Sequence, residues 1–101
     1  MRIAIFLGCL NFEAFQHVSI SEVLLFDVHD RLIKAIGIDK LLLTNVEYLL
    51  LWLMTHRVEQ VYLNHSEPQL IRHMEVAGLT VKSLDEIRNN PVYQAFLITH
   101  S

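Results

Sequence analysis

The amino-acid sequence predicts an α/β protein built on one mixed five-stranded sheet with helices on both faces. The main observation is the pattern of residues 58–82, which predicts a strand, a helix and a second strand in succession. A crossover of this length joins parallel neighbours through a right-handed connection. A second observation is the pair of apolar runs at 19–27 and 31–38 around a short turn at 28–30, which predicts an antiparallel hairpin. With a first strand at 2–7, the predicted order of elements is β-β-β-α-β-α-β-α.

The 58–82 unit carries its own start and stop signals. Ser66 is the predicted N-cap of the helix, with Gln69 at the capping-box position. Pro68 fits the first turn, where its missing N–H costs nothing. Gly78 is expected to end the helix in the left-handed conformation. The apolar positions of this helix follow helical spacing: Leu70, Ile71, Met74 and Ala77.

A second helix is predicted from a capping box at 44–47 to about His56. Its inner stripe is expected to be Val46, Leu49, Leu50, Leu53 and Met54. Tyr48, Leu51 and Trp52 form a second apolar patch nearly opposite, so this helix should be covered twice. The second cover is either the C-terminal segment or another subunit. That segment contains a short helix capped by Ser83 and a last helix from 90–91.

Composition sets the broad class. The 101 residues fit a single domain, 1–101, and are 52% hydrophobic and 19% charged with a net charge of −3. Without a basic cluster, no nucleic-acid footprint is expected. One cysteine fits a reducing cytoplasm. The apolar run 41–54 falls short of the roughly 18–20 residues of a membrane span, and no signal peptide is expected at the start.

Several segments together resemble a known family. The opening Met1–Ile5 (MRIAI), the strand 23–27 (VLLFD), the strand 58–62 (VEQVY) and the run 73–81 (HMEVAGLTV) match its pattern, as does the short helix 83–87. The chain in this respect resembles the dinitrogenase iron–molybdenum-cofactor biosynthesis family, the NifX-like accessory proteins. The resemblance implies a ribonuclease-H-like fold and the binding of an iron–sulfur or iron–molybdenum cluster. The chain departs from the family in its shorter 8–17 loop and in a 64–68 turn without glycine.

Cys9, His17 and His65 are the candidate metal ligands. In the predicted topology, the loops after the first and fourth strands meet at one edge of the sheet, where open α/β sheets bind ligands. A thiolate and two imidazoles suit zinc, iron or an iron–sulfur species, and Ser66 completes the candidate cofactor-binding set. The alternative is that Cys9 is a small buried side chain and both histidines are solvated. A nuclease centre at Asp27 and Asp30 is not expected, because both flank a turn and no acid lies in the first predicted strand.

Two functions follow as hypotheses. The first is a small non-catalytic accessory protein that carries a metal cluster at this sheet edge and works with protein partners in metallocluster assembly. The second is an interaction or regulatory module of the same fold without the cofactor. It would act by self-association as a homodimer, or by partner binding, through Tyr48, Leu51 and Trp52. An enzyme is not expected.

Overall fold

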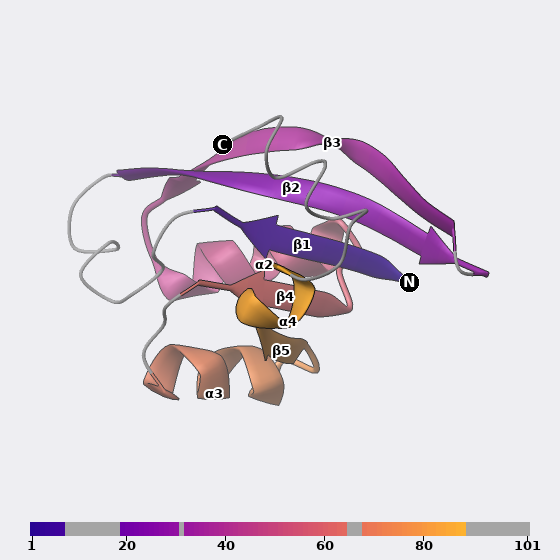
Figure 1. Cartoon of the computed structure of the whole chain (residues 1–101). Helices are drawn as coiled ribbons and strands as arrows, with labels where there is room; N and C mark the ends of the chain where they lie inside the picture. The colour runs from indigo at the N-terminus through magenta and orange to yellow at the C-terminus, as the bar shows by residue number, and fades with distance from the viewer. Residues whose placement is uncertain (8–18, 31, 65–67, 89–101) are drawn as a thin grey trace.

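The computed structural model describes residues 1–7, 19–30, 32–64 and 68–88 of the chain (Figure 1). These residues form five strands and three helices in an α/β arrangement. In chain order they are β1 (Arg2–Phe6), β2 (Ser19–His29), β3 (Leu32–Leu43), α2 (Val46–Thr55), β4 (Gln60–Leu63), α3 (Pro68–Val76), β5 (Thr80–Ser83) and α4 (Asp85–Arg88). The predicted last helix from 90–91 lies outside this part of the chain.

The sheet is mixed, with the order β3-β2-β1-β4-β5. β1 and β2 pair antiparallel, as do β2 and β3, whereas β1, β4 and β5 run parallel to one another. The strands of the 58–82 unit are therefore parallel neighbours, as predicted. The first strand of the chain lies at the centre of the sheet, with the hairpin on one side and the crossover unit on the other (Figure 1).

Each face of the sheet has its own core, and the alternation along β1 shows how the two are divided. Ala4 and Phe6 pack with Leu49 and Leu53 of α2 and with buried side chains of α3. Ile3 and Ile5 point to the opposite face, where Leu84 and Ile87 cover them. A strand alternates its side chains between the two faces, so a fully apolar β1 requires cover on both sides. The chain supplies it from α2 and α3 on one face and from the α4 segment on the other.

The β2–β3 hairpin is longer than the sequence predicted. β2 continues to His29 and β3 runs on to Leu43, so only Asp30 and Arg31 remain between the two strands. Asp30 adopts a left-handed φ of +48°, a conformation that aspartate tolerates in turns. The predicted turn at 28–30 was thus too wide, because Val28 and Ile33 still pair across the hairpin and pack on the core.

The cap of α2 differs by one residue from the predicted capping box. Asn45, in extended conformation, accepts a hydrogen bond from the Tyr48 backbone N–H at 2.7 Å. Asn45 is therefore the N-cap, not Thr44. Two further predictions are confirmed: Gly78 takes a φ of +93° after α3, and the Asp85 N–H donates to Ser83 Oγ at 3.2 Å at the start of α4. The predicted N-cap of α3, Ser66, lies outside the described residues. None of the helices described here is long and apolar enough to cross a membrane.

Candidate functional site

The carboxyl ends of β1 and β4 lie side by side at one rim of the sheet. The two strands pair in parallel, with Ile5 opposite Tyr62. The segments that follow β1 and β4 therefore leave the sheet in the same direction. Leu7 and Asn64, the last described residues beyond these strands, are both half-buried. The predicted ligands follow them: Cys9 and His17 come after β1, and His65 and Ser66 after β4. All four lie outside the described residues, so the structure gives the common origin of the two loops and not the geometry of the side chains.

The described residues do not contain a ready-made metal centre. Within the ranges given above, no group of three or more His, Cys, Asp or Glu side chains is placed to hold a metal ion. Asp27, which the sequence raised as a nuclease carboxylate, is used differently, as the polar contacts of β1 show.

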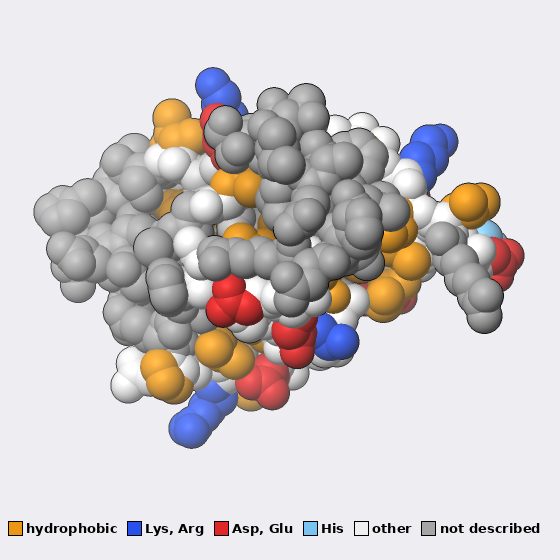
Figure 2. Space-filling model, viewed as in Figure 1, with side chains coloured by type: hydrophobic (Ala, Val, Ile, Leu, Met, Phe, Trp, Pro, Cys, Tyr) orange, Lys and Arg blue, Asp and Glu red, His pale blue; other side chains and the backbone are white. Residues whose placement is uncertain are grey.

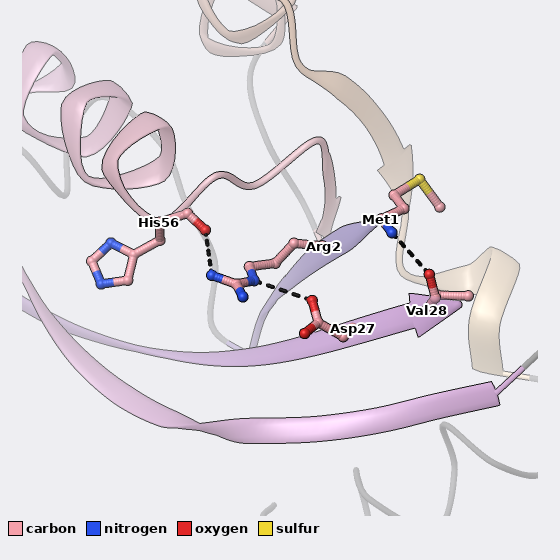
Figure 3. A network of polar contacts seen from close by, with 5 residues as sticks. All are labelled: Met1, Arg2, Asp27, Val28 and His56. Atoms are coloured by element: carbon pink, nitrogen blue, oxygen red, sulfur yellow. Dashed lines mark hydrogen bonds and ion pairs between the residues drawn. The ribbon is translucent and has the colours of Figure 1, made fainter. Parts of the chain in front are cut away.

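Arg2 connects three elements on the α2 side of the sheet (Figure 3). Its Nε lies 3.2 Å from Oδ1 of Asp27 on β2, and its Nη1 donates to the His56 carbonyl oxygen at 2.8 Å. That carbonyl lies at the C-terminus of α2, where a helix favours positive charge. Asp27 is therefore a structural partner of Arg2 in this network, which ties β1 to its neighbour strand and to the end of α2.

Of the three residues predicted to form an interface on α2, two are exposed and one is half-buried. Tyr48 and Leu51 are 42% and 63% exposed. Trp52 is half-buried, packs against the core and stacks on the His56 ring with centroids 4.0 Å apart. Met54, expected to face inward, is 57% exposed. The reason is geometric: each residue advances about 100° around a helix, which carries Met54 away from the stripe centred on Leu49 and Leu53.

The exposed side of α2 is therefore formed by Tyr48, Leu51 and Met54, spaced three residues apart. Trp52 belongs instead to the border of the core, because it lies only three residues after Leu49 and turns back toward the sheet. We call these three exposed residues the α2 patch.

The β2–β3 hairpin also exposes large apolar side chains, which the sequence analysis did not predict as an interaction surface. Figure 2 shows hydrophobic side chains toward the end of the molecule where the hairpin of Figure 1 projects. Leu32 is 74% exposed and Ile38 is 42% exposed. The exposed apolar side chains are distributed along the hairpin: Leu32 lies beside the turn, Ile36 and Ile38 in the middle, and Ile20 opposite Leu42 at the other end. The signal available in the sequence was the alternation of apolar residues from Ile36 through Leu42, which indicates a strand continuing beyond residue 38.

A surface hollow of about 320 Å³ lies along α3. It is lined by Gln69, Arg72, His73 and Val76, which all lie on one face of the helix. Among the described residues, only α3 lines this hollow, and we assign no binding or catalytic role to it.

Comparison with known proteins gives a likeness of fold. No protein-family model matches the chain, and no curated protein matches it. Among solved structures, the chain is similar to the crystal structure of PH0822, with a TM-score of 0.56 and 14% sequence identity over 82% of this chain and 76% of that one. At this level of identity the likeness concerns the fold alone.

Proposed function

We propose that this protein is a small non-catalytic accessory protein of the dinitrogenase iron–molybdenum-cofactor biosynthesis type, with a ribonuclease-H-like fold. Its cargo is a metal cluster, iron–sulfur or iron–molybdenum, bound at the rim where β1 and β4 end. The observation that carries this proposal is the parallel pairing of these two strands. It starts the loop containing Cys9 and the loop containing His65 from adjacent positions, at the edge where α/β sheets bind ligands.

The sheet supports the finer assignment of the fold. Only β2 runs against the direction of the other four strands, in the order β3-β2-β1-β4-β5. This arrangement agrees with a ribonuclease-H-like sheet, and the likeness to PH0822 extends over most of the chain. The sequence motifs of the family fall on these same strands, with Ile3–Ile5 on β1 and Val61–Tyr62 on β4.

The ligand chemistry is that of a thiolate and two imidazoles. Cys9 and His17 are the proposed principal ligands, with His65 and Ser66 contributing from the β4 side. Sulfur and imidazole donors suit iron–sulfur species and zinc, and a cysteine ligand is bound as the thiolate. A reducing cytoplasm keeps a lone cysteine reduced and therefore available as a ligand, which agrees with the proposed cytoplasmic location.

The test is anaerobic reconstitution with iron and sulfide, followed by measurement of bound iron per chain and of visible absorbance. We expect a coloured protein whose iron content and absorbance fall when Cys9 is replaced by Ser. His29→Ala is the matched control, because His29 lies at the far end of β2, in the hairpin, and is exposed. A colourless protein, or a Cys9→Ser variant that binds the same iron as the unaltered chain, contradicts the proposal.

A second candidate function is an interaction module that acts by self-association. The observation that favours it is the exposure of large apolar side chains on two surfaces, the α2 patch and the β2–β3 hairpin. Such side chains, when they gather, mark protein-interaction sites. Sedimentation velocity over a range of concentrations tests this candidate: we expect a dimer, and a protein that stays monomeric up to several hundred micromolar contradicts it.

A further inference from the structure

β3 forms one edge of the sheet. In the strand order it has β2 on one side and no described strand on the other. Its residues from Leu32 to Lys40 are exposed, apart from half-buried Ile33. Long edge strands with apolar side chains are templates for pairing with another chain unless charge or curvature prevents it. The charges on this strand are Lys34, Asp39 and Lys40, and their placement decides which partner fits.

We propose that the outer edge of β3 pairs antiparallel with β3 of a second copy of this chain, in the register that places Lys34 of each copy opposite Asp39 of the other. This inference rests on self-association, the second candidate function, and names its surface and geometry. It is independent of whether the rim of β1 and β4 binds a cluster.

A β-bulge in β3 makes this register possible. In a regular strand, residues five apart point to opposite faces, and two such residues cannot lie opposite each other in a two-fold pairing. Here Leu25 pairs with Gly37 and the next residue, Phe26, pairs with Ala35, so Ile36 is the extra residue of the bulge. Residues after the bulge therefore alternate between the two faces of the sheet in the opposite order to residues before it.

The cross-strand partners show that Lys34 and Asp39 share a face. Lys34 pairs with Asp27 and Asp39 pairs with Val23, and these two β2 residues lie four apart on the same side of a regular strand. Both charged side chains are therefore on the α2 face and are exposed. The same holds on the other face, where Ala35 pairs with Phe26 and Ile38 with Leu24.

In the proposed register most of the remaining positions place apolar residues opposite each other, with Ile33 opposite Lys40 as the exception. Ala35 of one copy faces Ile38 of the other on the same side of the sheet, and Leu32 faces Leu41. At the two-fold axis, Ile36 lies opposite Gly37 of the second copy. A Cβ at Gly37 would meet no atom within 4 Å outside its two chain neighbours, which leaves room beside this glycine for the second copy.

Charge disfavours the obvious competing registers. A pairing centred on Lys34, on Asp39 or on Lys40 puts identical charges directly opposite, which is destabilising in an antiparallel pair. The proposed register instead forms the Lys34–Asp39 ion pair twice, once on each side of the axis. Because the axis is perpendicular to the sheet, the α2 helices of both copies lie on the same face of the joined sheet.

The experiment is a charge exchange measured by sedimentation equilibrium in reducing buffer. Lys34→Glu alone sets Glu against Asp twice, and Asp39→Lys alone sets Lys against Lys twice. We expect each single variant to weaken the dimer by about tenfold or more. The double variant restores the original affinity within a few-fold. An equimolar mixture of the two single variants also dimerises, since each chain then meets only opposite charges at these positions.

The mixture is the decisive measurement, because it combines two variants that are each expected to dimerise weakly on their own. Circular dichroism and thermal unfolding of each variant check that the fold is kept. Leu51→Glu is the control for the α2 patch. A dimer that is insensitive to both single variants, or that is lost with Leu51→Glu alone, overturns the β3 register while leaving self-association in place. A monomeric unaltered chain overturns both.

Discussion

At the scale of single residues, Arg2 shows how one side chain joins elements that are distant in sequence. Its guanidinium contacts Asp27 and the His56 carbonyl oxygen in directions that a planar group with several donors can satisfy together. The Arg2 and Asp27 side chains remain 32% and 45% exposed, so the ion pair itself is screened by water. We expect the bond to the helix C-terminus to contribute more, because it satisfies a carbonyl that the end of the helix leaves without an intrahelical partner.

We therefore expect Arg2→Met to lower the free energy of unfolding by about 1 kcal/mol, with Asp27→Asn having a smaller effect. The measurement is equilibrium unfolding in urea, read as a shift in midpoint at constant slope. Lys82→Met removes an exposed charge from β5 and should leave the midpoint unchanged. An Arg2→Met midpoint equal to that of the unaltered protein would show that neither contact contributes in solution.

At the scale of secondary-structure elements, the sequence predicts which elements form better than where they begin. The described residues of 58–82 fold as predicted, because the left-handed glycine at 78 and the apolar spacing of α3 agree. The hairpin was predicted too short, because Asp39 and Lys40 interrupt the apolar residues of β3 although Leu41 and Leu43 beyond them are buried. On α2, the capping signal pointed to Thr44 although Asn45 is the cap. Either side chain can cap a helix, and the choice depends on where β3 ends.

The two possible caps give a direct comparison. Asn45→Ala removes the acceptor of the Tyr48 N–H and should destabilise the protein by about 1 kcal/mol. Thr44→Ala should change stability by only a few tenths of that amount, because Thr44 lies outside the cap and is exposed. Thermal unfolding of both variants measures the difference. Equal losses, or a larger loss for Thr44→Ala, would return the cap to the position that the sequence suggested.

At the scale of the whole molecule, the solvent exposure of the strands rises from the centre of the sheet to the β3 edge. β1 is buried on both faces and pairs on both sides, and β4 next to it is buried along its whole length. β3 at the edge is mostly exposed on both faces. The sequence shows this gradient only in part: Lys34 within the third predicted strand indicates a partly solvated edge strand, whereas Arg2–Phe6 and Leu32–Ile38 are both rich in apolar residues. The difference between them is set by strand order. Cys9, His17 and His65 remain predictions for a related reason: strand order brings their loops to one rim without fixing the side chains.

Amide hydrogen exchange should follow this gradient, since exchange from a paired central strand requires opening of the core and exchange from an edge does not. In dilute protein, we expect the slowest amides in Ile3–Ile5 and Val61–Tyr62 and the fastest strand amides in the 34–40 part of β3. Raising the protein concentration should protect the 34–40 segment selectively, because edge pairing between two copies occupies its outward-facing N–H groups. The central strands serve as the internal control, since their amides are already paired within one chain. Uniform exchange rates across β1 and β3 would contradict the gradient, and concentration-independent rates in 34–40 would place any self-association on another surface.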